Sequence, residues 1–389
     1  MRRLTVALAA VLILGLLVAQ FFYVGKERPL YVPVIPALPI ISAGLLPLFA
    51  PSPSPTSLSG SLPDPFIALA VPPVGMPPVI TPTASPTPLP TFTPTPRPTP
   101  PLPTPVPTPT PRKPVEKITK IGVGIYNHGG GHDINMLFRL KPTIILLTEP
   151  DMDFAKEVRH WFPKSFIVGR RFVTQQPLDN PQERGRQFAD YVAQLAVPLR
   201  GYVDAWVSYN EPISAGNYED YKAYNAFQVA FARRLQGTHG IAAVAGNDAV
   251  GVIQPQDYAR YFAEAIGESR YFALHAYAPP RAASLRQDAE WFVLRYRLVH
   301  KALQEAGVRH GPMILTESGL WAGWRGVVND EQMARDFVWL TDELEKDPYV
   351  LGHAIFGIFD NGTWPDFDIS NTSILDRLGE YQPPPLGGS

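Results

Sequence analysis

Two glutamates each follow an apolar run and stand beside other polar residues. Asn210 and Glu211 close the segment VSYNEP, and Glu317 lies in the segment ILTESG. Burial of an unpaired carboxylate is costly, so a glutamate at such a place is either solvated or belongs to a site. Pro212 has no amide hydrogen and cannot continue a strand ladder. The sequence therefore indicates a polar strand end at Glu211 and another at Glu317.

Two carboxyl groups that face each other across a pocket can cleave a glycosidic bond. One has to be protonated to donate to the leaving oxygen, and the other ionised to attack the sugar or to activate water. His275 and Tyr277 end a third apolar run in the pattern H-x-Y. Taken singly, Asn-Glu-Pro also suits a helix N-cap, and T-E-S-G suits an exposed turn. Together the motifs favour a site.

Eight apolar runs alternate with amphipathic segments over residues 116–382. Several runs lack polar alternation, as expected of parallel strands that are buried on both faces. Between them, aromatic residues such as Tyr224, Phe227 and Phe231 recur at helical spacing. This order predicts a (β/α)8 TIM barrel. A doubly wound open sheet is the alternative, but no G-x-G-x-x-G follows the first run. The runs span 117–127, 142–150, 165–173, 203–212, 241–249, 271–280, 312–320 and 351–361.

The two glutamates occupy equivalent positions in two of these repeating units. They are 106 positions apart in the chain, which is close to three β/α units of about 33 residues each. In a barrel of this kind the active site lies at the carboxyl ends of the strands. Glu211 and Glu317 are therefore expected at the same end of the barrel, on the fourth and seventh strands.

These motifs resemble a family of enzymes. N-E-P at the fourth run, H-x-Y at the sixth and T-E-S-G at the seventh are similar to retaining glycoside hydrolases of the barrel clan whose catalytic glutamates end strands four and seven. That clan includes cellulases, β-mannanases, β-xylosidases and β-galactosidases. The resemblance covers about residues 117–370 and implies double displacement on a β-linked oligo- or polysaccharide. Glu211 would be the acid/base and Glu317 the nucleophile.

The resemblance also implies roles for the neighbouring residues. Asn210 would bind the sugar 2-hydroxyl, Tyr277 would orient Glu317, and His275 would line the site beside it. Strand eight usually ends in a tryptophan that forms a sugar platform. Here the strand ends at residues 358–360, and Trp364, a few positions later, is expected to supply that surface.

The chain departs from the family pattern at strand two. Many clan members carry an arginine there that supports the nucleophile, whereas this chain reads Leu147-Thr148-Glu149-Pro150. Arg170 or Arg171, at the end of strand three, could replace it, and one of them could instead pair with Glu149. We expect Arg171 to bind substrate. The departure keeps an alternative open, in which a catalytically inactive barrel serves as a surface carbohydrate-binding protein.

A glycine-rich stretch, His128-Gly-Gly-Gly-His132, follows the first run. An oxyanion hole of the lipase type would need a G-x-S-x-G elbow, which this chain lacks. Two histidines could bind a metal, but three glycines disfavour the helix that would align them. We therefore expect a loop in which Tyr126 and His128 contact sugar, and no metal or other cofactor.

The remaining segments concern location and partners. Residues 1–28 combine two arginines with a long apolar stretch, which predicts a signal anchor with the barrel outside the cytoplasm; a cleaved signal peptide and secretion are the alternative. Residues 29–115 hold 29 of the 45 prolines and predict a disordered linker. Residues 383–389 form a short tail. A net charge of −1 gives no indication of nucleic-acid binding, and the absence of cysteine excludes thiolate chemistry.

Overall fold

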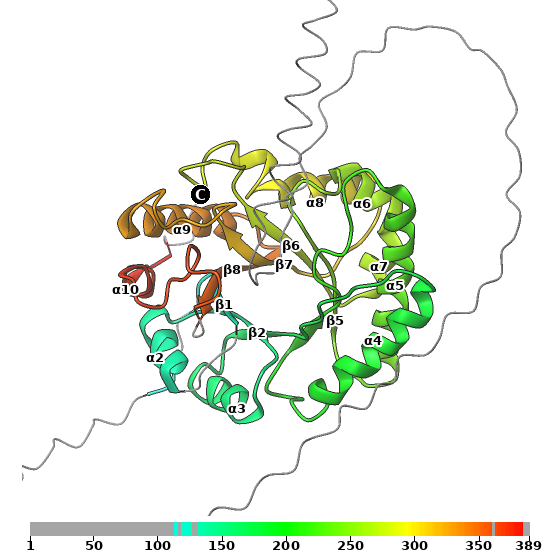
Figure 1. The fold of residues 1–389 in the computed structure, drawn as a ribbon, viewed down its shortest axis with the longest axis horizontal. Helices are drawn as coiled ribbons and strands as arrows, with labels where there is room; N and C mark the ends of the chain where they lie inside the picture. Colours follow the sequence, from blue (N-terminus) through cyan, green and yellow to red (C-terminus); the bar gives the residue numbers. More distant parts are fainter. Residues whose placement is uncertain (1–112, 116–117, 127–130, 360–361, 384–389) are drawn as a thin grey trace, which may run out of the picture. The chain divides into compact units, whose positions relative to one another are not determined.

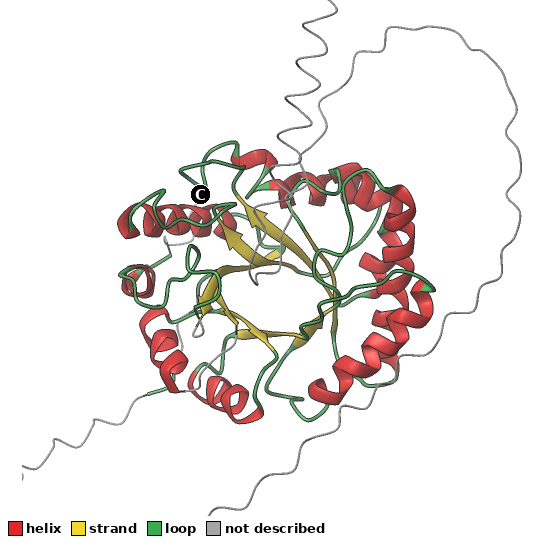
Figure 2. Cartoon of the chain, in the orientation of Figure 1, coloured by secondary structure: helices red, strands yellow, loops and turns green. Residues whose placement is uncertain are grey.

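A computed structural model describes residues 113–115, 118–126, 131–359 and 362–383. Eight parallel strands pair in chain order, and β8 pairs with β1 to close the barrel. Figures 1 and 2 show the helices in a ring around these strands. The predicted (β/α)8 barrel is thus confirmed. The strands are β1 (Ile121–Tyr126), β2 (Ile144–Thr148), β3 (Phe166–Arg170), β4 (Ala205–Val207), β5 (Ala243–Asp248), β6 (Tyr271–Tyr277), β7 (Met313–Gly319) and β8 (Val350–Phe359).

Two of the helices each begin after an asparagine whose side chain caps the helix. Asn217 accepts a hydrogen bond from the Asp220 amide before α5, and Asn329 accepts one from the Gln332 amide before α9. Such caps satisfy amides that lack a partner within the helix. The helices are α2 (Gly131–Leu140), α3 (Met152–Trp161), α4 (Pro181–Ala196), α5 (Tyr218–Gly237), α6 (Pro255–Tyr261), α7 (Ala263–Glu268), η1 (Ala289–Trp291), α8 (Arg295–Glu305), α9 (Asp330–Glu345) and α10 (Ile374–Glu380).

The core has two layers, which explains the apolar runs of the sequence. Val168, Val207 and Val244 lie in a cluster inside the barrel, while Phe227 and Phe337 belong to the cluster between strands and helices. Because neighbouring residues on a strand point to opposite faces, both sets must be apolar. A polar side chain that faces inward therefore has the lowest free-energy cost of burial at the ends of the strands.

Glycines make room for one aromatic ring in the barrel. A Cβ atom on Gly124 would lie 2.5 Å from the Tyr126 hydroxyl, and one on Gly357 would lie 2.6 Å from the Tyr126 ring. Only glycine leaves this space open, so Tyr126 folds back over its own strand. Its ring stacks on Phe359 at 4.9 Å and meets Phe356 edge-on at 4.7 Å.

Several predictions concern segments outside the described residues. These are the anchor at 1–28, the linker at 29–115 apart from residues 113–115, the tail beyond residue 383, and His128. Among the helices that the structure describes, none is both long enough and apolar enough to cross a bilayer.

Candidate active site

Glu211 lies beyond strand four rather than within its end. The sequence placed Asn210 and Glu211 at the end of the strand, but β4 stops at Val207. Glu211 has a left-handed φ of 52°, and its amide donates to the Asn247 carbonyl at 3.1 Å. That conformation is incompatible with a strand, so the chain turns there while it stays tied to β5. Glu211 consequently reaches the carboxyl ends of the strands from a loop.

The two glutamates converge on His275. The Nδ1 atom of His275 lies 2.6 Å from Glu211 Oε1 and 3.7 Å from Glu317 Oε2. One side-chain ligand atom from each of the three residues lies within 4.8 Å of the other two. The structure therefore brings together the pair that the sequence placed in matching phase, with His275 between its members.

Two donors hold the carboxylate of Glu317, a residue that is 5% exposed. Arg170 donates to Oε1 at 2.6 Å, and Tyr277 donates its hydroxyl to Oε2 at 2.8 Å. Burial by itself raises the pKa of Glu317, but His275, Arg170 and the Tyr277 hydroxyl outweigh it and lower the pKa below the usual range. Glu317 is accordingly held ionised and oriented, a state that suits a nucleophile.

Strand three supplies the arginine that strand two lacks. Arg170 faces into the barrel and binds Glu317, whereas the next residue, Arg171, faces the other way and pairs with Glu149 at 2.9 Å. The guanidinium of Arg171 also lies 3.8 Å from the centre of the Tyr191 ring. Adjacent residues on a strand point to opposite faces, so only one of the two arginines can face the pair. The arginine beside the carboxylates is therefore Arg170, and the pairing of Arg171 with Glu149 gives no support to the predicted contact of Arg171 with substrate.

Amides hold the residue before Glu211 in place. The Asn210 backbone pairs with Gln176, its amide donating at 2.6 Å and its carbonyl accepting at 2.8 Å. The Oδ1 atom of Asn210 accepts from Arg170 at 2.9 Å and from Asn247 Nδ2 at 2.6 Å. With Oδ1 doubly occupied, the Nδ2 group is the donor that Asn210 presents to a ligand.

Sequence reasoning missed Asn247 and Asp248, which end β5. The signal was available, because both residues close an apolar run, as Glu317 does. Neither carboxylate oxygen of Asp248 has a hydrogen-bond partner within the described part of the chain. Burial raises the pKa of Asp248 to about 7, with His275 lowering it and Glu211 raising it further.

The aromatic residues occupy different depths. Tyr126 is 5% exposed, and the Arg170 guanidinium lies 5.0 Å from its ring centre. Tyr126 thus lies beneath the arginine, and its position does not support the predicted contact with sugar.

Trp364 is 48% exposed and packs edge-on against Phe356 at 5.9 Å. Phe356, which sequence reasoning missed, is half-buried and lies 6.3 Å from the Tyr277 ring. Phe356 and Trp364 together form an aromatic surface beside the pair.

The three-residue cluster could also supply metal ligands. Glu211, His275 and Glu317 offer two carboxylates and an imidazole. However, both oxygens of Glu317 already accept hydrogen bonds, and the donor to Oε1 is a cation. A guanidinium at 2.6 Å opposes a second cation at the same carboxylate. The donor set therefore fits an organic substrate better than a metal ion.

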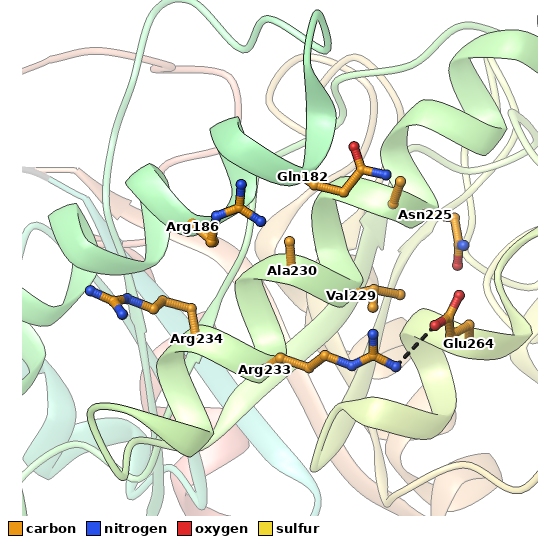
Figure 3. A pocket seen from close by; sticks show the side chains of 9 residues that line it. Gln182, Arg186, Asn225, Val229, Ala230, Arg233, Arg234 and Glu264 are labelled. Atoms are coloured by element: carbon orange, nitrogen blue, oxygen red, sulfur yellow. Dashed lines mark hydrogen bonds and ion pairs between the residues drawn. The ribbon is translucent and has the colours of Figure 1, made fainter.

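A separate hollow of about 400 Å³ lies among the outer helices α4, α5 and α7 (Figure 3). It includes none of the strand-end residues, and each of its arginines is paired. Arg186 binds Glu183 at 2.6 Å, while Arg233 binds Glu264 at 3.0 Å. Arg234 binds Asp190 in the same way. With its cations neutralised, this hollow shows no chemistry comparable to that of the strand ends.

No protein-family model and no curated protein sequence matches this chain. Solved structures of similar fold include a family 39 glycoside hydrolase from Bacteroides cellulosilyticus WH2, at 13% identity and a TM-score of 0.48, covering 66% of this chain and 60% of that one. A family 5 glycoside hydrolase from Prevotella bryantii B14 has 13% identity and a TM-score of 0.46, covering 67% and 95%.

An endo-β-1,3-glucanase of family 128 from Amycolatopsis mediterranei, solved with laminarihexaose, has 15% identity and a TM-score of 0.41, covering 67% and 98%. All three structures are thus named as glycoside hydrolases. At these identities the likeness concerns the fold alone. What the chain does has to be argued from the side chains at its strand ends.

Proposed function

We propose that this protein is a retaining glycoside hydrolase that acts on a β-linked oligo- or polysaccharide. One observation carries the proposal: a carboxylate oxygen of Glu211 and one of Glu317 lie within 4.8 Å of each other at the strand ends. Retaining enzymes keep their two carboxyl groups about 5–5.5 Å apart, whereas inverting enzymes need about 6.5–9.5 Å to admit a water molecule. The separation supports direct attack by one carboxylate.

Glu317 is the nucleophile in this proposal. Its carboxylate is ionised and fixed by Arg170 and Tyr277, so little reorganisation is needed before it attacks the anomeric carbon. As the bond from the anomeric carbon to Glu317 forms, the glycosidic bond breaks. The leaving oxygen takes a proton from Glu211, which is the more exposed of the two side chains, at 18% against 7%.

Glu211 then changes its role. As a carboxylate, it removes a proton from a water molecule that attacks the glycosyl-enzyme, which frees Glu317 and returns the proton to Glu211. Two displacements at one carbon restore its original configuration. Proton transfer of this kind is worth about 10²–10⁴ in rate. His275, at 2.6 Å from Glu211, is placed to stabilise either protonation state.

The surroundings of the pair suit a neutral sugar. The Nδ2 group of Asn210 is available to a hydroxyl oxygen, and Phe356 with Trp364 offers apolar ring faces for sugar C–H groups. The sequence-based alternative, an inactive carbohydrate-binding barrel, drew its support from the arginine missing at strand two. Arg170 now fills that role at Glu317, which favours the enzyme.

Replacement of Glu317 by Gln tests the proposal. The variant keeps the shape of the side chain but has no carboxylate to attack, so turnover across a panel of aryl β-glycosides and β-glucans should vanish. Glu149→Gln is the matched control, since Glu149 also follows a strand but pairs with Arg171; it should keep activity. Undiminished turnover by the Glu317 variant contradicts the assignment, and a first-formed product of inverted configuration in proton NMR excludes a nucleophilic carboxylate.

We further propose that residues 1–28 hold the barrel outside the cytoplasm on the proline-rich linker. Support comes from Arg2 and Arg3 preceding an apolar stretch long enough to span a bilayer. In membranes washed with alkaline carbonate, the full chain should stay with the lipid, and a protease added outside intact cells should release the barrel. Recovery of a shortened chain from the medium would instead indicate a cleaved signal peptide.

A further inference from the structure

We propose that Asn247 is a positioning residue that fixes a proton on Nε2 of His275, so that Nδ1 faces Glu211 as the partner for its acid proton. The geometry carries the first half of this inference on its own. The consequence for catalysis rests on the proposed function, with Glu211 as the acid/base.

The direction of every hydrogen bond in this network follows from Arg170. A guanidinium only donates, so the Asn210 atom that faces Arg170 NH1 at 2.9 Å must be the carbonyl oxygen. The same oxygen lies 2.6 Å from the side chain of Asn247. Asn247 must therefore turn its NH2 group toward Asn210, since two carbonyl oxygens would repel each other.

That orientation decides the proton of His275. With its NH2 group committed to Asn210, Asn247 presents Oδ1 to the other side, where Thr316 donates at 2.6 Å and His275 Nε2 lies at 3.3 Å. A carbonyl oxygen only accepts. His275 must hence carry a hydrogen on Nε2, whatever the protonation state of the rest of the ring.

His275 then has one nitrogen left for Glu211. In neutral His275, Nδ1 is bare and accepts the proton of Glu211 at 2.6 Å; in the cation, Nδ1 donates to an ionised Glu211. Either way one proton is shared between the two residues, next to the leaving oxygen in the proposed reaction. Among the described residues, the charged and titratable groups that face His275 are Glu211, Glu317, Asp248, Arg170 and Tyr277.

The backbone explains why asparagine occupies this place. Asn247 is fully buried and has a φ of 68°, a left-handed conformation that asparagine, aspartate and glycine tolerate best. The β5–β6 register shifts between Gly246 and Asp248, and this irregularity turns the Asn247 side chain toward Asn210 and His275. Glycine and aspartate are consequently the two substitutions that alter the amide and spare the backbone.

The two variants should change His275 in different ways. Asn247→Gly removes the acceptor at Nε2, which frees the hydrogen to move to Nδ1 and leaves the acid proton without its partner. Asn247→Asp keeps an acceptor but places a carboxylate beside Nε2, which stabilises the cation. By analogy with other residues that orient a catalytic group, we expect a loss of about 10–100-fold in kcat/KM for unactivated leaving groups. Dinitrophenyl glycosides, which need no acid, should change less than about threefold.

The experiment combines that comparison with a nitrogen NMR measurement on the full chain labelled at histidine. His275→Gln identifies the resonances among the eight histidines. In the wild type, the long-range spectrum should show neutral His275 protonated on Nε2. In Asn247→Gly the population of neutral His275 should shift toward the Nδ1 tautomer. In Asn247→Asp the basic limb of the kcat/KM profile, on which the shared acid proton is lost, should move to higher pH. Asn180→Gly is the control, because Asn180 also has a positive φ but no side-chain capping bond.

Two results would overturn the inference. One is a wild-type His275 that carries its proton on Nδ1 when neutral. The other is an Asn247→Gly variant whose His275 tautomer and titration match those of the wild type and of the Asn180 control. Because the NMR readout needs no substrate, a protein without glycosidase activity would refute the proposed function and still leave the role of Asn247 decided.

Discussion

Two buried histidines of this barrel lie in opposite electrostatic surroundings. His275, at the end of β6, contacts the carboxylate of Glu211 and lies near that of Glu317. His353, in β8, lies between two hydroxyls, Ser318 Oγ at 2.8 Å and Thr341 Oγ1 at 3.1 Å. Both rings are almost inaccessible to water, so burial alone does not distinguish them.

Their proton affinities differ because of their neighbours. Burial lowers the pKa of His353 to about 3, since no charged group in the described part of the chain compensates for the lost hydration. Burial also acts to lower the pKa of His275, but the carboxylates of Glu317 and Glu211 outweigh it and raise the pKa. A buried imidazole in this fold is therefore neutral unless acidic side chains, such as those at the strand ends, raise its pKa.

The surroundings of His353 are those of a packing contact, whereas those of His275 belong to the candidate active site. The β8–α9 contact uses His353 to connect two neutral hydroxyls, and Thr341 passes its own hydrogen to the Phe337 carbonyl at 2.8 Å. The strand-end region instead concentrates two acids, an arginine and an imidazole around a few ångströms of space. Perturbed titration in such a cluster is typical of catalytic sites, whereas a neutral buried ring is typical of packing.

Removal of the Glu211 carboxylate beside His275 should have the largest effect on the difference between His275 and His353. In Glu211→Gln we expect turnover of substrates with poor leaving groups to fall by about 10²–10⁴. Dinitrophenyl glycosides should still form the glycosyl-enzyme, so KM should fall together with kcat as the second step becomes limiting. His275 loses one of the charges that raise its pKa, so the pKa should fall, while that of His353 should stay unchanged in the same NMR titration.

A second measurement on the same residue distinguishes lost proton transfer from a damaged site. In Glu211→Ala, azide enters the space of the carboxylate and attacks the glycosyl-enzyme without a base, which should restore turnover and yield a β-glycosyl azide. Lys156→Ala changes an exposed lysine of α3 and serves as the control. Azide should not raise its turnover. Absence of rescue, or an azide product of inverted configuration, would contradict Glu211 as the acid/base.

The sequence predicted the barrel because its signals repeat. Eight apolar runs at regular spacing leave few arrangements, and the distance from Glu211 to Glu317 placed both residues at one end without knowledge of any contact. The place of His275 beside Glu317 was expected only from the family resemblance, and the structure puts His275 in contact with Glu211 as well. Properties that depend on chain order and repeat length were thus accessible from the sequence.

Contacts that depend on local irregularities were not accessible. The choice between Arg170 and Arg171 turned on which one faces the barrel interior, and a shift of one residue would have exchanged them. The side chain of Asn247 turns inward because the β5–β6 register shifts beside it, and Glu317 pairs with His275 across a similar shift between β6 and β7. An isolated glycine such as Gly246 can indicate a bulge, but it does not show which side chain the bulge redirects, so the network around Glu211 required the structure.

The smallest effect concerns folding rather than turnover, and it is tested by replacing each of the two histidines in turn with glutamine. The pKa of His353 is lower in the folded chain, at about 3, than in the unfolded chain, at about 6.5. Its contribution to stability is present above pH 6.5 and is lost as the pH falls toward 3, by about 1.4 kcal/mol per pH unit. The glutamine in His353→Gln does not titrate and should keep the contacts with Ser318 and Thr341. In this variant the free energy of unfolding should therefore fall less steeply between pH 6.5 and 3, by the same amount per pH unit.

His275→Gln should change the free energy of unfolding on the alkaline side of the pH range instead. Because the pKa of His275 is raised in the folded state, its contribution is full below pH 6.5 and is lost as the pH rises through the folded value. Urea unfolding at a series of pH values should therefore show the two variants departing from the wild type in different pH ranges and with opposite slopes. Parallel curves for the two variants would mean that both rings are neutral packing groups, and the electrostatic distinction between the two regions would be wrong.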